Sequence, residues 1–239
     1  MSDDFIGGSK DGTHIFDDFH SNSAITTGLV GNLNWDMTTI AHASTPSFVA
    51  SPNGVLRLAA AAASGDGEAL TLKADGVVLV GDGQVFRCRV RYPNSVTTGV
   101  VRNSLTGNNF RIGFGNLVTA VEHSVGVFLS SDAGVLTWTC ANTTTDVTGT
   151  VTGIPTLTGG TTMVLDKWHD LELRLTETNV VGAPYKISCL VDGYPAGEIV
   201  TAVLAANETM EFSIVHYQDS GAIAHFDIDY YEAWIPRFG

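Results

Sequence analysis

The chain has 239 residues, of which 44% are hydrophobic and 15% charged, a composition typical of a folded domain with one large core and not of a disordered chain. Twenty-five acidic residues against twelve basic ones leave a formal charge of −13, which repels phosphate backbones and argues against nucleic-acid binding. No run approaches the roughly 18 consecutive apolar residues of a membrane span, and the first ten residues lack the basic and apolar regions of a secretory signal, so we expect synthesis in the cytoplasm.

The first fifty residues show little regular alternation. The stretch HIFDDFH (14–20) is a candidate strand, and the residues after it are expected to run over the surface with Trp35 as an anchor. Trp35 is therefore our candidate for an exposed ring that stacks on sugars. We predict an N-terminal segment, residues 1–15, that could form an arm, followed by a single domain over residues 16–239.

From residue 54 onward, apolar and polar residues alternate with a period of two, and no segment of helical length carries a helical stripe. The segment 141–163 is rich in Thr and Gly, and we expect it to be a long exposed loop or a weak edge hairpin. More than ten predicted strands indicate an all-β fold, with two antiparallel sheets packed face to face as a β-sandwich or jelly roll. The clearest predicted strands are 84–92 and 170–177. Further candidates are 54–59, 68–73, 110–115, 124–130, 135–140, 185–192, 197–203, 210–216 and 225–234.

Cysteines, histidines and acidic turns give no sign of a metal or another cofactor. Cys88, Cys140 and Cys189 occupy apolar strand positions and are expected to be small buried side chains. The seven histidines show no metal-binding spacing, and surface or partly buried positions are expected for them. Acidic loops such as the one with Asp66 and Glu68 could supply calcium ligands, but ordinary turn chemistry explains them as well.

The order of several segments resembles a known family. FDDF, NLNW, NGVLRLAAAAASGDGEALTL, FRCRVRY, FRIGFGN, VGVFLSSDAGVLTW, KWHDLELRL, KISCLVDG and FDIDYYEAW follow one another as in the concanavalin A-like (laminin G-like) jelly-roll modules encoded among bacteriophage structural genes. The resemblance covers about residues 16–234. It implies a two-sheet jelly roll and a place on a virion, as a capsid decoration, a head fibre or a tail-associated component.

Near the C-terminus, Asp227, Asp229 and Glu232 form a D-x-D-x-x-E arrangement. Glycanases of this fold family that resemble laminarinases carry E-x-D-x-E, or E-x-D-x-x-E with a bulge, but here an Asp replaces the expected nucleophilic Glu and the motif lies at the very end of the chain. Strand parity places Glu232 on the opposite face from the aspartates unless a bulge intervenes. We therefore expect Asp227 and Asp229 to be solvent-facing and no residue to be catalytic, with Tyr230 and Trp234 on the core face.

Three arginines, Arg87, Arg89 and Arg91, project from one face of a single predicted strand. Such a ladder could bind a carboxylate-bearing partner surface, or it could pair with acids on neighbouring strands, such as Asp170 and Glu172. It is our first candidate for a contact with a protein partner.

Together these observations favour a non-enzymatic bacteriophage virion protein. The expected role is a capsid decoration or head-fibre component that docks on the major capsid protein or another virion protein, is located on the capsid surface, forms a homo-oligomer and adheres weakly to cell-surface or mucus glycans. No nucleic acid, membrane or cofactor is expected. The alternative is a glycan-cleaving enzyme or a tail-associated carbohydrate-binding module on the same fold, since this fold hosts lectins, hydrolases and structural modules alike.

Overall fold

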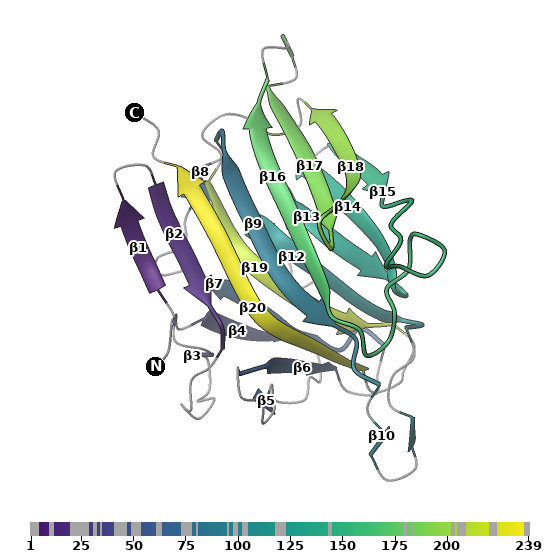
Figure 1. The fold of residues 1–239 in the computed structure, drawn as a ribbon. Coiled ribbons are helices and arrows are strands. Elements are labelled where there is room, and N and C mark those ends of the chain that lie inside the picture. Colours follow the sequence, from purple (N-terminus) through teal and green to yellow (C-terminus); the bar gives the residue numbers. More distant parts are fainter. Residues whose placement is uncertain are drawn as a thin grey trace.

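The computed structural model of the chain is an all-β sandwich of two nine-stranded sheets, which confirms the predicted fold class (Figure 1). No helix occurs among the residues that the structure describes. These residues are 5–9, 12–19, 29–30, 33, 35–40, 47–48, 54–60, 64–72, 78–79, 81–94, 96–97, 100–101, 105–117, 123–142, 145–178, 181–182, 184–201, 204, 209–219 and 224–236.

Sheet A faces the viewer in Figure 1, and its outer face carries the candidate functional site. All of its pairings are antiparallel, and β6 (Leu56–Ala60) joins it by pairing with both β20 and β5 (Ser47–Phe48). Its main strand order is β1 (Phe5–Ser9), β2 (Gly12–Asp17), β20 (Ala224–Pro236), β9 (Gln84–Arg91), β16 (His169–Glu177), β17 (Tyr185–Val191) and β18 (Tyr194–Thr201).

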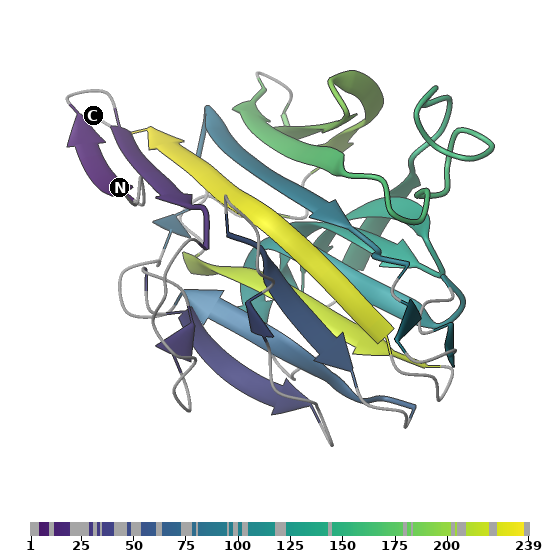
Figure 2. The same cartoon turned by 60° about the horizontal axis from the view of Figure 1, so that its bottom comes forward.

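Sheet B lies behind sheet A, and Figure 2 shows the two layers one above the other. A short strand, β8 (Val78–Leu79), pairs with β19, and β10 (Val96–Thr97) with β11 (Val100–Val101) forms a separate two-stranded hairpin. The main order of sheet B is β15 (Thr145–Thr150), β14 (Val135–Asn142), β13 (His123–Asp132), β12 (Asn108–Leu117), β19 (Thr209–Gln218), β7 (Gly67–Leu72), β4 (Trp35–Ile40) and β3 (Leu29–Val30).

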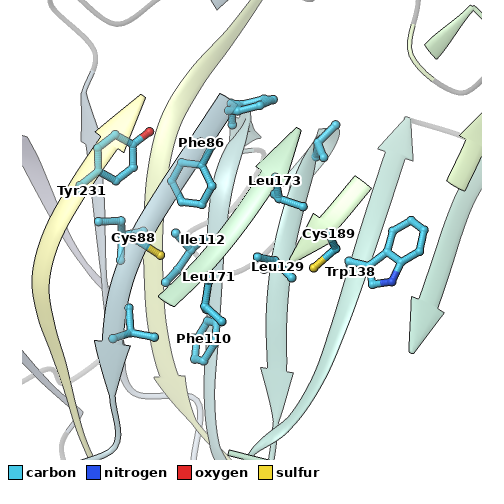
Figure 3. Packing of buried hydrophobic residues seen from close by; sticks show 14 of the residues in the cluster. Phe86, Cys88, Phe110, Ile112, Leu129, Trp138, Leu171, Leu173, Cys189 and Tyr231 are labelled. Carbon is cyan, nitrogen blue, oxygen red and sulfur yellow. The ribbon is translucent and has the colours of Figure 1, made fainter. Parts of the chain in front are cut away.

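The core lies between the sheets and follows the period-two alternation of the sequence (Figure 3). On β9, Phe86 and Cys88 are fully buried, and on β12 Phe110 and Ile112 meet them from the other layer. Burial of each such side chain contributes about 1.5–3 kcal/mol. Cys140 and Cys189 are also free and buried, so the prediction of small buried thiols is confirmed for all three cysteines.

One edge of the sandwich closes around Trp138, which is buried. Its ring lies between Gly149 of β15 and Gly197 of β18, where an added Cβ atom would come within 3 Å of the indole. Glycine at these two positions therefore allows the edge strands of the two sheets to approach each other.

The N-terminal residues belong to the sheet. β1 pairs with β2, and β2 pairs with β20 from Gly12 to Asp17, so the predicted boundary at residue 15 falls inside β2. The described part of segment 1–15 extends sheet A instead of forming a separate arm.

The Thr- and Gly-rich segment divides into two parts. β15 is an edge strand, as one of the two alternatives predicted. Residues 151–168 form a loop in which Val151, Ile154, Leu157 and Met163 are buried, while residues between them such as Thr152 and Pro155 are exposed. The alternative of an exposed loop describes this part only incompletely, since its widely spaced apolar residues serve as anchors that show no strand period.

A buried hydrogen-bond network fixes this loop to β16. Val164 N–H donates to Nε2 of His169, so Nδ1 carries the proton and donates to Asp192 Oδ2 at 2.9 Å. The hydroxyl of Thr156 and the backbone N–H of Asp170 also donate to the Asp192 carboxylate. Burial opposes ionisation of Asp192, but these hydrogen bonds and the nearby His169 lower its pKa overall. His169 and His216 are fully buried, contrary to the surface or partly buried positions expected for the histidines.

Candidate functional site on the outer face of sheet A

A bulge in β20 determines which of its side chains reach the outer face. The pairing of β20 with β9 shifts register between Ile228 and Tyr230, so that Ile228 and Tyr231 both point into the core. Tyr230, Glu232 and Trp234 consequently lie on the outer face together with Asp227. The prediction that Tyr230 and Trp234 belong to the core is wrong, because simple alternation cannot anticipate the extra residue.

Asp227 is fully buried, so its predicted exposure to solvent is wrong. Arg57 of β6 donates to both of its oxygens, at 2.6 and 2.9 Å, and Arg91 of β9 donates to Oδ2 at 2.9 Å. Asp229, at the bulge, is 18% exposed and lies 3.3 Å from Arg89. Burial raises the pKa of Asp229, and the Arg89 charge opposes this shift.

The arginine ladder exists, and each rung is paired. Arg87 binds Glu172 at 2.9 Å, while Arg89 and Arg91 bind the aspartates of β20. Of the two acids expected to pair with the ladder, Glu172 does so, whereas Asp170 accepts a hydrogen bond from the Tyr230 hydroxyl at 3.0 Å. The side chains of Arg87 and Arg89 remain 45% and 42% exposed, so the ladder lies on the surface, and its contact with a protein partner stays a prediction.

Aromatic side chains border the ladder at both ends. At one end, the rings of Trp234 and His14 lie 6.1 Å apart, and further along β2 the ring of Phe16 stacks on Tyr230 at 6.1 Å. At the other end, the Trp168 ring lies 4.5 Å from the guanidinium of Arg91. The sequence had not identified Trp168 or Trp234 as surface residues.

Trp35, the ring predicted to bind carbohydrate, is fully buried. Its Nε1 donates to Asp17 at 2.9 Å, and its ring packs edge-on against Tyr231 at 5.0 Å. Because the indole lies in the core at the start of β4, the prediction of an exposed platform there is wrong.

A cavity of about 580 Å³ opens on this face beside Trp234. Glu172, 5% exposed, accepts hydrogen bonds from Arg87 through Oε2 and from Arg174 through Oε1, which fixes both guanidinium groups. The hydrogen bond with Glu172 raises the pKa of Arg87, which therefore stays charged. The lining residues are His14, Val85, Arg87, Glu172, Arg174, Glu232 and Trp234.

Within the described part of the chain, no group of three or more His, Cys, Asp or Glu side chains could hold a metal ion. Asp66 and Glu68, considered above as calcium ligands, are each 1% exposed. Over the same residues, no helix is long and apolar enough to cross a membrane.

Comparison with known proteins identifies the fold of the chain but does not assign it to a family. No protein-family model and no curated protein matches the chain by sequence. Among solved structures, a protein of unknown function from Shewanella oneidensis superimposes with a TM-score of 0.59 at 11% identity, over 95% of this chain and 88% of that one.

Two further similar structures have named carbohydrate functions. The carbohydrate recognition domain of Emp47p gives a TM-score of 0.58 at 10% identity, over 94% of this chain and 95% of that one. A GH16 protein from a mixed linkage glucan PUL of Bacteroides ovatus, in complex with the G4G4G3G product, gives a TM-score of 0.57 at 10% identity. The match covers 92% of this chain and 99% of that one. The fold is therefore a concanavalin A-like jelly roll, which lectin-like and glycan-cleaving domains share.

Proposed function

We propose that the chain is a non-enzymatic carbohydrate-binding module whose binding surface is the outer face of sheet A. The observation that carries the proposal is the placement of Trp234 and Trp168 at opposite ends of the row of ion-paired arginines on β9. Sugar rings stack on aromatic faces, and arginine N–H groups donate to sugar hydroxyls.

The dimensions of the face favour an oligosaccharide over a single sugar. Trp234 pairs with Val85, and Trp168 lies over Arg91, so the two rings are six residue steps apart along β9. At about 3.3 Å per residue this separation is roughly 20 Å. The ion pairs along the row hold the arginines in place before a ligand arrives, which lowers the ordering cost of binding.

The state of the carboxylates supports a binding role over hydrolysis. A retaining glycosidase needs two carboxyl groups about 5 Å apart, one free to attack the sugar and the other protonated to assist the leaving group. Asp227 is bound by two arginines and is inaccessible, and Glu232 Oε1 is hydrogen-bonded to His14 Nε2 at 2.8 Å. Asp227 is therefore not placed as a free nucleophile, and His14 holds one of the two oxygens of Glu232.

We also propose that the module functions on a bacteriophage virion, synthesised in the host cytoplasm, as a homo-oligomeric capsid decoration or head-fibre component. The resemblance of the segment order to jelly-roll modules encoded among bacteriophage structural genes supports this placement. The major capsid protein would be the partner. Purified protein added to particles that lack it should appear as symmetric, stoichiometric density by electron microscopy. Particles that remain bare would contradict the virion role and leave the glycan-binding role intact.

A glycan array, followed by calorimetry on each glycan bound, tests the carbohydrate role. Replacement of Trp168 or Trp234 by Ala should weaken binding at least about tenfold, because stacked aromatic anchors dominate such interfaces. Tyr194→Ala removes an exposed ring at the start of β18 and should leave affinity unchanged. Equal loss in all three variants, or no loss in any of them, would contradict the proposed face, and release of new reducing ends from a bound glycan would show an enzyme instead.

A further inference from the structure

The cavity beside Trp234 offers both donors and acceptors of hydrogen bonds. Arginine carries five N–H groups, and Glu172 takes two from Arg87 and one from Arg174, so further N–H groups of both remain on the cavity wall. Glu232 Oε2 lies 4.0 Å from Arg87 Nη1, beyond hydrogen-bond distance, and is available to accept. The Trp234 ring adds an apolar wall.

The cavity is also electrically balanced. Arg87 and Arg174 are matched by Glu172 and Glu232. Positive and negative charges also balance over all outer positions of β6, β20, β9 and β16. These positions carry five of the chain's eight arginines and five acids, namely Arg57, Arg87, Arg89, Arg91 and Arg174 against Asp170, Glu172, Asp227, Asp229 and Glu232.

A carboxylate or sulfate on the ligand would disturb this balance. It would bring a second negative charge next to Glu232, which repels it, and it would compete with Glu172 and Glu232 for the same guanidinium groups. The formal charge of −13 on the chain repels a polyanion further. A hydroxyl group both donates and accepts, and therefore fits Glu232 and the arginines at once.

From this arrangement we infer that the cavity lined by His14, Arg87, Arg174, Glu232 and Trp234 is a subsite for one unit of a neutral glycan, and that the face selects neutral over acidic polysaccharides. The inference rests on the proposed function and adds to it the class of ligand and the position of the selecting residue. Trp234 provides the stacking surface, Glu232 rejects anions, and Glu172 is a positioning residue that fixes the two arginines from beneath.

Matched pairs of oligosaccharides test the selectivity. The probes are tetrasaccharides of β-1,4-glucan, β-1,4-mannan and α-1,4-galactan, each compared by calorimetry with the uronate of the same backbone, in which a carboxylate replaces the C6 hydroxymethyl group. At least one neutral probe should bind, and its uronate should bind at least about tenfold more weakly, as expected for like-charge repulsion.

Three variants locate the selectivity and the stacking surface. Glu232→Gln replaces the carboxylate by a neutral amide that can still form hydrogen bonds, so the ratio of neutral to acidic affinity should narrow by about tenfold. Glu198→Gln removes an acid from an exposed pair with Lys186 on β17 and β18 and should leave the ratio unchanged. Trp234→Ala should weaken binding of every probe that the parent protein binds.

The outcomes separate the two proposals. Tighter binding of the uronates, with loss in Trp234→Ala, would overturn the neutral selectivity and keep the glycan-binding face. Binding of none of the six probes would overturn both, and an unchanged affinity ratio in Glu232→Gln would overturn the role of this carboxylate.

Discussion

At the scale of single residues, Glu68 shows how burial changes chemistry inside the sandwich. It is 1% exposed on β7, Oε2 accepts a hydrogen bond from Ala59 N–H, and Oε1 has no hydrogen-bond partner. Burial raises the pKa of Glu68 to about 8, although the Ala59 hydrogen bond opposes the shift. The carboxyl group is therefore protonated at neutral pH.

Because its pKa is raised, ionisation of Glu68 lowers the free energy of unfolding as pH rises. Between pH 4.5 and about 8 the unfolded chain releases the Glu68 proton and the folded chain keeps it, so the free energy of unfolding falls across that window and then levels off. Glu68→Gln removes this loss. The free energy of unfolding of the variant, relative to that of the parent, should therefore be higher at pH 9 than at pH 4 by on the order of 4 kcal/mol. Urea unfolding of both proteins at the two pH values measures the difference, and parallel pH profiles would contradict the expectation.

His216 lies opposite Glu68 in the pairing of β19 with β7 and affects the stability of the fold at acidic pH. Burial lowers the pKa of His216 to about 3, with the charge of His225 as a smaller cause. The unfolded chain binds a proton at this histidine below pH 6.5 and the folded chain does not until about pH 3, so stability is lost as pH falls through that window. His216→Gln should flatten this part of the profile, and an acid transition unchanged by the substitution would show that other groups govern it.

At the scale of elements, the ion-paired aspartate Asp227 joins β6 and β9 to β20. Removal of one member of a buried pair leaves the partner charges uncompensated, which costs about 3–5 kcal/mol when the group is fully enclosed. Arg57 and Arg91 keep 20% and 25% of their side chains exposed, so Asp227→Asn should cost about 2–4 kcal/mol. Chemical denaturation measures this loss, with Glu198→Gln as a surface control expected to cost under about 1 kcal/mol. Equal small losses in both variants would contradict a structural role for the pair.

The loop 151–168 gives a second prediction at this scale. Asp192→Ala removes the acceptor of three hydrogen bonds, from His169, Thr156 and the backbone of Asp170, so the loop should open more often than in the parent protein. Lys167 lies inside the loop and donates to Thr156 O at 2.8 Å, and it provides a tryptic site that reports the opening. Limited trypsin digestion should cut after Lys167 at least about tenfold faster than in the parent or in the control Asp146→Ala on β15. A rate unchanged by Asp192→Ala would show that the buried apolar anchors alone fix the loop.

Local patterns predicted the strands better than the site. Alternation predicted a strand at 84–92, close to the observed Gln84–Arg91, because one buried face and one polar face leave a direct trace in the sequence. The bulge at Asp229 leaves no such trace. It places Tyr230 and Trp234 on the outer face of the sheet, whereas alternation predicted the core face. The cavity could not be predicted because it joins His14 to Glu232, which lie 218 positions apart and meet only through the pairing of β2 with β20.

At the scale of the whole molecule, charge is unevenly distributed. The chain is strongly acidic overall, yet the outer face of sheet A between β6 and β16 is balanced and holds most of the arginines. A surface of this kind does not depend on long-range attraction to charged partners. Binding of a neutral glycan should accordingly change less than about twofold between 0.05 and 0.5 M salt, as calorimetry at both concentrations can measure, whereas a steep salt dependence would indicate an ionic partner.

The four tryptophans permit the most direct test of the glycan-binding face. Trp35 and Trp138 are buried in the core, while Trp168 and Trp234 are only partly buried on the outer face of sheet A. In a titration with a bound glycan followed by the ¹⁵N indole signals, Trp168 and Trp234 should shift with a common dissociation constant and Trp35 and Trp138 should stay in place. Shifts spread over all four indoles, or binding that leaves Trp168 and Trp234 unchanged, would contradict the proposal that this face binds carbohydrate.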